Sequence, residues 1–210
     1  MPKFYPVMMD LRGRKCVVVG GGEVSARKAE TLLECGAKVT VVSPELETSL
    51  EYLVRNGKIS HVKEEYRKGA LDGAAIAVAA TDREEVNRAV YADATAGGIP
   101  VNVVDVPELC TFIVPSVVER GDLIIAISTS GKSPAMAKRI RKETEERFGP
   151  EYGAMLELMG EIRALVQKRV PELERRMAIL SEIANGDLLE RIKRGEKPGA
   201  EDVLRGKIEP

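Results

Sequence analysis

The chain has 210 residues, of which 44% are hydrophobic and 31% are charged, and its formal net charge at pH 7 is −1. This length allows one large domain or one domain with appendages, and the small net charge excludes the global basic field of proteins that bind nucleic acid or acidic membranes. No apolar run reaches the ~18 residues that span a bilayer, and the N-terminus has no long apolar signal segment. We therefore expect a soluble, cytoplasmic protein with no nucleic-acid or membrane partner.

Short apolar runs alternate with helix-like segments in the first half of the chain. We expect strands at 16–19, 38–42, 59–62, 74–81 and 100–105, and helices at 24–33, 46–54 and 83–96. Strands linked by helices of this length form right-handed crossovers and a parallel sheet that is covered on both faces. This order predicts an α/β fold, a Rossmann-type doubly wound parallel sheet, over residues 1–113.

The pattern changes in the second half. One more apolar strand is expected at 122–128, and Pro134 suits the first position of a charged helix that continues to about residue 147. Beyond residue 150 only helical periodicity is present, with breaks at Pro171, Gly186 and Gly195. We therefore predict a connecting region at 114–149 and a small, all-helical C-terminal domain at 150–210.

The cysteines and the single histidine give no sign of a metal centre. Cys16, Cys35 and Cys110 lie too far apart for zinc or redox motifs, which favours a reducing compartment. We interpret Cys16 and Cys35 as small buried hydrophobes and leave Cys110 open. His61 is interpreted as a surface residue of the third strand. No fixed metal site and no Ser-His-Asp arrangement is predicted.

A glycine loop, VVVGGGEVS, joins the first strand to the first helix and matches G-x-G-x-x-S at Gly20, Gly22 and Ser25. In dinucleotide-binding units the first glycine allows a tight turn, the second lets the pyrophosphate approach the backbone, and the third position takes a small side chain. The helix N-terminus offers N–H groups to the phosphates. The loop therefore predicts a dinucleotide site, although glycines could also be required by the turn alone.

The second strand ends in VVSPE, where many NAD enzymes carry a carboxylate for the ribose hydroxyls. Ser43 ends this strand and Glu45 follows it. No arginine stands at this tip to bind a 2′-phosphate, which favours NAD over NADP. The alternative for Glu45 is a carboxylate that merely begins the next helix.

Polar residues also end the fourth and fifth strands. Because ligands lie outside the carboxyl ends of parallel strands, we expect Thr81 and Asn102 beside the cofactor. Asp105 follows in the same place, and a carboxylate beside a nicotinamide is a candidate general acid or base. The alternative is that Asp105 only shapes the turn before Pro107.

The segment STSGKSPAMAKR, residues 128–139, contains a GKS sequence that invites comparison with a phosphate-binding P-loop. A P-loop requires glycine where this chain has Ala126, and Pro134 follows the serine that would bind magnesium. We instead interpret Ser133 as a helix N-cap. Residues 132–147 hold six basic and three acidic side chains, so an acidic ligand is conceivable and a solvated helix face is the alternative.

Taken together, these segments resemble the precorrin-2 dehydrogenase and sirohydrochlorin ferrochelatase family of siroheme synthesis, in its stand-alone form. The resemblance covers nearly the whole chain. It is carried by VVVGGGEVSARKAETLLECGAKVTVVSPE, by AVAATD, and by the joining of D-x-P-x-L-C-x-F-x-x-P to S-x-S-G-x-S-P-x-x-A from Asp105 onward. It implies a homodimer with a dimerisation region at 114–149, NAD-dependent oxidation of precorrin-2 to sirohydrochlorin and, in some members, insertion of ferrous iron.

The resemblance also implies roles for single residues. Asp105 matches the family's general acid/base aspartate, and Ser128, Lys132 and Ser133 become candidates for contact with a substrate that bears eight carboxylates. Ser128 matches a serine that is phosphorylated in some fused members. The NAD contacts carried over by motif are Gly20, Gly22, Glu23, Val24, Pro44 and Glu45.

The resemblance leaves the range of activities open. The fused siroheme synthases carry an additional methyltransferase domain, and we do not expect one in this chain. We therefore expect uroporphyrinogen methylation to come from another protein. An NAD-sensing regulatory module without catalysis and a chelatase without dehydrogenase activity remain alternatives. No residue decides whether a metal is inserted, or which one.

Overall fold

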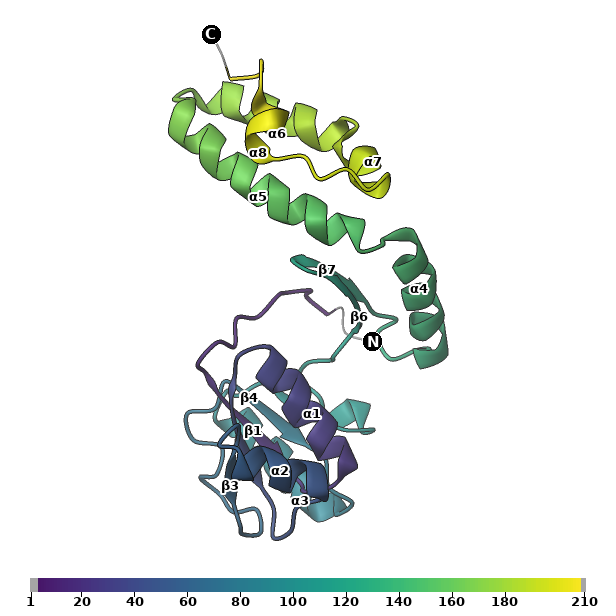
Figure 1. Cartoon of the computed structure of the whole chain (residues 1–210). Helices are drawn as coiled ribbons and strands as arrows, with labels where there is room; N and C mark the ends of the chain where they lie inside the picture. Colours follow the sequence, from purple (N-terminus) through teal and green to yellow (C-terminus); the bar gives the residue numbers. More distant parts are fainter. Residues whose placement is uncertain (1–3, 209–210) are drawn as a thin grey trace. The chain divides into compact units, whose positions relative to one another are not determined.

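The computed structural model describes residues 4–208, and the chain divides into two compact units, Met1–Val114 and Pro115–Pro210. The first unit contains a five-stranded parallel sheet in the order β3-β2-β1-β4-β5 (Figure 1). Its strands are β1 (Lys15–Val19), β2 (Lys38–Val42), β3 (Ser60–Val62), β4 (Ile76–Ala79) and β5 (Val101–Val103). Its helices are α1 (Glu23–Glu34), α2 (Thr48–Arg55), α3 (Glu84–Ala96) and the 3-10 helix η1 (Pro107–Leu109).

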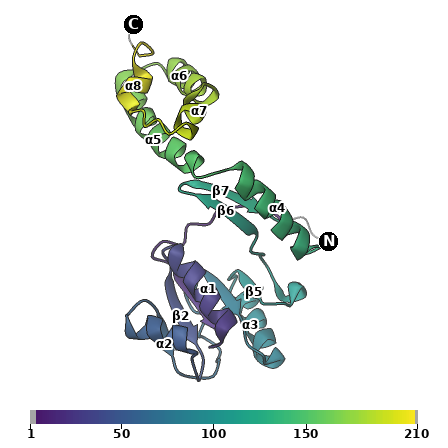
Figure 2. The same ribbon diagram turned by 45° about the vertical axis from the view of Figure 1, so that its right-hand side comes forward.

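Strand β1 shows why this sheet is covered on both faces. Cys16 and Val18 belong to a core that includes residues of α1 and α2, whereas Val17 and Val19 belong to a second core that includes residues of α3. Alternate residues of a strand point to opposite faces, and each fully buried valine contributes about 1.5–3 kcal/mol. The continuous apolar run therefore fixes a central strand, and the predicted doubly wound α/β fold is confirmed (Figure 2).

The strand order also locates the crevice of the sheet. Strand β1 pairs with β2 on one side and with β4 on the other, so the chain reverses its winding direction at β1. Ligands of open α/β sheets bind outside the carboxyl ends of the strands at this switch point. Two strands end earlier at this edge than we expected. Strand β4 ends at Ala79 and not at residue 81, and β5 ends at Val103 and not at residue 105.

The second unit begins with an antiparallel hairpin, β6 (Ser116–Arg120) and β7 (Leu123–Ile127), of which only the second strand was predicted. Helix α5 packs against α6, α7 and α8 around a core that contains Ile162, Val166 and Leu204, so the predicted helical tail is confirmed. The helices of this unit are α4 (Pro134–Arg147), α5 (Glu151–Arg169), α6 (Leu173–Asn185), α7 (Leu188–Lys193) and α8 (Ala200–Leu204).

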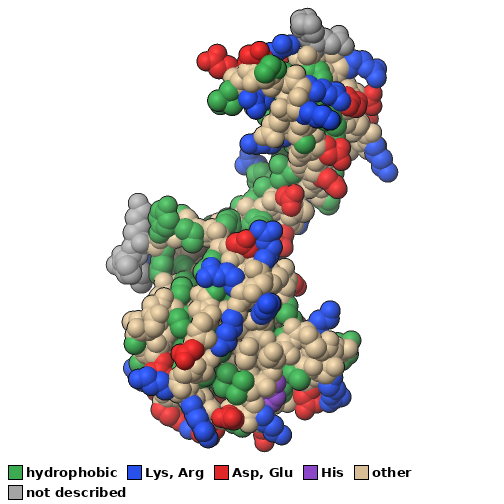
Figure 3. Space-filling view, turned by 90° about the vertical axis from the view of Figure 1, so that its left-hand side faces the viewer, with side chains coloured by type: hydrophobic (Ala, Val, Ile, Leu, Met, Phe, Trp, Pro, Cys, Tyr) green, Lys and Arg blue, Asp and Glu red, His purple; other side chains and the backbone are tan. Residues whose placement is uncertain are grey.

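The surface of each unit is charged, and the cysteines differ in their exposure. On the face drawn in Figure 3, basic and acidic side chains are interspersed on each unit. Within residues 4–208, no helix combines the length and apolar composition of a membrane span. Cys16 is buried as expected, but Cys35 is exposed near the end of α1, so its interpretation as a buried hydrophobe is wrong.

Candidate dinucleotide-binding site

A cleft of about 640 Å³ opens at the carboxyl ends of β1, β2 and β4. Three segments line it: the glycine loop with the start of α1, the loop after β2, and the turn after β4. Glu65 and Tyr66, from the loop after β3, complete the lining. The cleft brings together these predicted cofactor residues: Gly20, Gly22, Glu23, Val24, Ser43, Pro44, Glu45 and Thr81.

The three glycines of the loop meet different surroundings. Gly20 has a φ of 123°, and a Cβ there would collide with the carbonyl oxygen of Ala80. A Cβ on Gly21 would collide with the backbone of Glu45 and would lie 2.6 Å from the Ser43 hydroxyl. A Cβ on Gly22 would meet nothing within 4 Å. The first two glycines are therefore required by packing, whereas Gly22 faces open space.

Gly22 and the first turn of α1 fit the pyrophosphate of a dinucleotide. Gly22 is the N-cap of α1, with φ −91° and ψ −175°, and it supplies no side-chain cap to the helix. The first N–H groups of a helix lack intrahelical partners and attract anions. Ser25, fully buried, lies with its hydroxyl 3.3 Å from the Ala80 carbonyl oxygen, so the third motif position packs α1 on the sheet.

Hydrogen bonds hold the loop after β2 in place. The Ser43 hydroxyl donates to the Glu45 carbonyl at 2.7 Å, and Glu47 N donates to Gly21 O at 2.8 Å. The Nε2 atom of His61 lies 2.9 Å from the Ser43 carbonyl oxygen, which can only accept, so Nε2 donates. His61 is half-buried, and its ring makes this contact with the neighbouring strand, so it is not simply a surface residue. Glu45 is exposed in the cleft lining, two residues before the N-cap Glu47 of α2.

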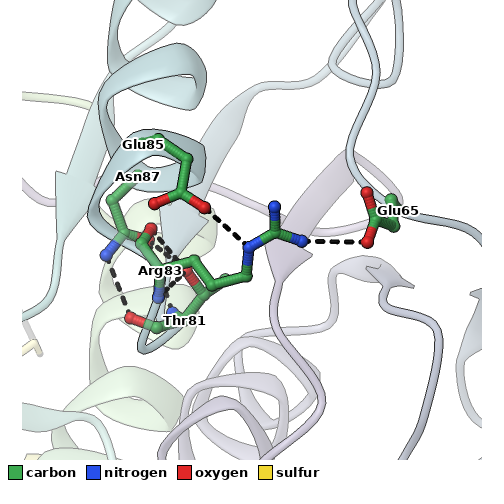
Figure 4. Close-up of polar contacts among 5 residues, drawn as sticks. All are labelled: Glu65, Thr81, Arg83, Glu85 and Asn87. Atoms are coloured by element: carbon green, nitrogen blue, oxygen red, sulfur yellow. Dashed lines mark hydrogen bonds and ion pairs between the residues drawn. The ribbon is translucent and has the colours of Figure 1, made fainter.

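The turn after β4 contains a polar network that the sequence did not indicate (Figure 4). The Thr81 hydroxyl lies 2.8 Å from Asn87 Oδ1, and Asn87 Nδ2 donates to the Thr81 carbonyl at 3.0 Å. Arg83 donates from Nε to Glu85 at 2.8 Å and from a terminal nitrogen to Glu65 at 2.9 Å. The hydrogen bonds to Glu85 and Glu65 raise the pKa of Arg83, and the Arg83 side chain lowers the pKa of Glu85.

Asn102 lies within β5 and Asp105 follows that strand, on the side of the switch point opposite to β2. In the described residues, neither of them lines the cleft. Asp105 is exposed with a φ of 62°, a conformation that aspartate tolerates better than most residues. Asn102 donates to the Phe112 carbonyl at 3.1 Å and so supports the chain after η1. The Cys110 thiol donates to Val103 O at 3.2 Å, and burial raises its pKa.

The serine-rich loop belongs to the second unit. Ser133 is the N-cap of α4 and accepts from Met136 N at 3.2 Å, as we expected from Pro134. The Ser128 hydroxyl accepts from Ser130 N at 3.0 Å. Ser128 and Lys132 are exposed, and Ser133 is half-buried. A turn closed by the hydrogen bond from Lys132 N to Thr129 O, at 3.0 Å, contains Lys132 and is flanked by Ser128 and Ser133.

A second hollow, of about 490 Å³, lies on the other side of the loop after β2. It shares Pro44, Glu45 and Leu46 with the cleft but includes none of the glycines, so the dinucleotide interpretation belongs to the larger cleft. His61 and Glu51 also line this hollow. Across the described part of the chain, no group of three or more His, Cys, Asp or Glu side chains is arranged to hold a metal ion.

Three family models match successive parts of the chain. Residues 7–116, more than half of the chain, match the family described as "Putative NAD(P)-binding". Residues 120–147 match the family "Sirohaem biosynthesis protein central". Residues 151–208 match the family "Sirohaem synthase dimerisation region".

Individual proteins agree with these models. The siroheme synthase of Methylobacillus flagellatus is 42% identical over 200 residues, which are 95% of this chain and 43% of that protein. The siroheme synthase of Azotobacter vinelandii is 38% identical over 205 residues, 98% of this chain and 44% of that protein. The chain thus spans less than half the length of these curated relatives.

A solved structure, "SirC, precorrin-2 dehydrogenase", superposes on this chain with a TM-score of 0.80 at 26% sequence identity. The superposition covers 97% of this chain and 98% of the solved chain. The chain therefore belongs to the family described as "Putative NAD(P)-binding", and its two sirohaem-protein regions follow that domain in chain order.

Proposed function

We propose that the chain oxidises precorrin-2 to sirohydrochlorin with NAD as the oxidant. The observation that carries this proposal is the match to the solved precorrin-2 dehydrogenase over 97% of this chain and 98% of that one. The cleft supports it independently, because Gly22 leaves open space at a helix N-terminus, where a pyrophosphate binds. Bound NAD would supply the hydride acceptor.

The residues of the cleft would hold and orient this cofactor. The backbone at Gly22 and the first turn of α1 would bind the pyrophosphate, and Glu23 and Val24 begin that turn. Glu45, exposed at the tip of β2, would accept hydrogen bonds from the adenosine ribose. Ser43 fixes the conformation of this tip through its own hydrogen bonds.

Asp105 would take up the proton that the tetrapyrrole loses when it also loses a hydride. It follows β5, on the side of the switch point opposite to β2, which is the side of the nicotinamide half in this fold. Within residues 4–208, its carboxylate forms no hydrogen bond or ion pair, so its lone pairs are available to a substrate. A carboxylate that only shaped the turn would be expected to bond to the backbone of that turn.

We further propose that Ser128, Lys132 and Ser133 contact the substrate's carboxylates, and that the chain acts as a homodimer in the cytoplasm. The charge of Lys132 and the hydroxyl groups of its neighbours are the donors that carboxylates require. The match of residues 151–208 to a dimerisation region supports the dimer.

An anaerobic absorbance assay with freshly generated precorrin-2 and NAD tests the oxidation directly. We expect NADH and sirohydrochlorin to form together with the wild-type chain. In Asp105→Asn, which keeps the side-chain size and tolerates the φ of 62°, turnover should fall by about 100-fold or more while NAD affinity is retained. Wild-type turnover in this variant would contradict the role of Asp105, and NAD binding without any oxidation would favour an NAD-sensing module.

A second activity, iron insertion, is favoured by the name of the curated relatives, siroheme synthase. The same cuvette tests it after the oxidation is complete. Adding ferrous iron should give siroheme faster than in the absence of protein if the chain is also a chelatase. An equal rate with and without protein would restrict the chain to the dehydrogenase step.

A further inference from the structure

The side chains that line the cleft carry more negative than positive charge. Its described lining carries five carboxylates and one basic side chain, Arg83. The carboxylates are those of Glu23, Glu45, Glu47, Glu65 and Asp82. A ligand with additional phosphate groups would therefore depend strongly on Arg83, since arginine binds phosphate through bidentate, charge-assisted hydrogen bonds.

Arg83 is already engaged on two sides. Its guanidinium donates to Glu85 in the first turn of α3 and to Glu65 in the loop after β3, at 2.8 and 2.9 Å (Figure 4). Its backbone N–H donates to the Thr81 hydroxyl at 3.2 Å, so the base of the side chain is also held. The contact with Glu65 joins two segments that line the cleft and lie 18 residues apart in sequence.

These contacts direct the guanidinium toward the adenosine side of the cleft. Glu65 follows β3, which is the edge strand beyond β2, and the tip of β2 is where the adenosine ribose binds in this fold. A 2′-phosphate on that ribose requires an arginine that is available to it. Arg83 is half-exposed and lines the cleft, but its charge is balanced by two carboxylates.

We propose that Glu65 is a specificity-determining residue of the cleft. By binding the guanidinium of Arg83, Glu65 makes this arginine unavailable to a 2′-phosphate, and the cleft therefore favours NAD over NADP. Glu65 acts in two ways. It occupies one terminal nitrogen of the Arg83 guanidinium, and its own negative charge repels an added phosphate, which discriminates against the wrong ligand. This inference rests on the proposed function, since it presupposes that the cleft binds a dinucleotide.

Equilibrium titration of the full chain with NAD and with NADP tests the inference without any turnover. In Glu65→Gln, the affinity for NADP should rise by about tenfold, the value of one strengthened charge-assisted hydrogen bond. The affinity for NAD should change by less than about twofold, since NAD carries no 2′-phosphate. The measured quantity is therefore the ratio of the two dissociation constants, with thermal unfolding as a check that the variant is folded.

Glu84→Gln is the matched control. Glu84 lies in the first turn of α3, next to Glu85, pairs with Arg88 and does not line the cleft. Its replacement by glutamine changes the net charge by the same amount as Glu65→Gln does. The double variant Glu65→Gln/Arg83→Gln should lose the gain in NADP affinity, because the gain depends on the released guanidinium. An unchanged ratio in Glu65→Gln, or an equal shift in Glu84→Gln, would overturn the inference. A wild-type chain that binds neither dinucleotide would overturn the proposed function itself, and this inference with it.

Discussion

Replacing Gly22 by aspartate should separate cofactor binding from folding. The side chain of residue 22 would point into open space, and the backbone conformation of Gly22 is one that any residue adopts. Aspartate is also a better N-cap than glycine by a few tenths of a kcal/mol, and its charge is favourable at a helix N-terminus. Gly22→Asp should therefore unfold at the same temperature as the wild type or slightly higher.

The same carboxylate should repel the pyrophosphate that we assign to the start of α1. Two unit charges 4 Å apart repel by about 1 kcal/mol in bulk water and by about 4 kcal/mol at the effective dielectric constant of a protein surface. Gly22 is exposed, so the penalty lies between these limits. The affinity for NAD should fall by a factor between about five and several hundred.

Isothermal titration calorimetry with NAD measures this loss, and Gly22→Asn provides a neutral side chain of nearly the same size. The electrostatic argument requires that Asp weakens binding more than Asn, and that the difference shrinks in high salt, where the screening length is only about 3 Å at 1 M. Equal losses in both variants would show that size, not charge, is responsible. Wild-type affinity in Gly22→Asp would place the pyrophosphate elsewhere.

Three further substitutions or reactions test single contacts. His61→Ala should weaken NAD binding about threefold to tenfold, because the Ser43 carbonyl loses its hydrogen-bond donor. His61→Gln can still donate and should bind NAD normally in the same titration. A loss of affinity that glutamine does not restore would contradict this positioning role. Ser133→Ala should lower the free energy of unfolding by about 1 kcal/mol in urea denaturation, because α4 loses its N-cap, whereas Ser133→Asn should not lower it. Equal stability of the wild type and Ser133→Ala would show that the cap contributes nothing. Alkylation at pH 8, followed by mass spectrometry, should modify Cys110 slowly, because its raised pKa keeps the thiolate scarce. Rapid labelling of Cys110 in the folded chain would be inconsistent with its buried hydrogen bonds.

The sheet of the first unit could be predicted because β1 and β4 are buried on both faces and appear as continuous apolar runs. Strand β6 was missed because its sequence, SVVER, is short and ends in two charged residues. A usable signal was nevertheless present. Gly121 and Asp122 separate two β-branched runs as a two-residue turn, and Gly121 has a φ of 58°, which glycine at the first turn position allows.

Sequence motifs could indicate the candidate site only where its residues are consecutive in the chain. The glycine loop and the tip of β2 each occupy a few consecutive residues, so a motif could indicate them. Arg83 and Glu65 belong to different loops, and in the sequence Arg83 is simply one charged residue at the start of a helix. His61 was misjudged for the same reason, since its contact with Ser43 is made between neighbouring strands. Contacts of this kind follow from the strand order and not from any short pattern.

The glycine loop was open to two interpretations from sequence, a tight turn or a phosphate site, and the structure separates the glycines that packing requires from the one that it does not. Gly20 and Gly21 lie against Ala80 and Glu45, so a side chain at either position would push apart the segments that form the cleft. Gly22 has no such neighbour. A fold that needed glycine only for its turn would accept a good N-cap residue at position 22, because aspartate, serine and asparagine all stabilise helix starts better than glycine does. Packing does not require glycine at position 22, so a ligand that occupies the space is the best explanation for the glycine found there.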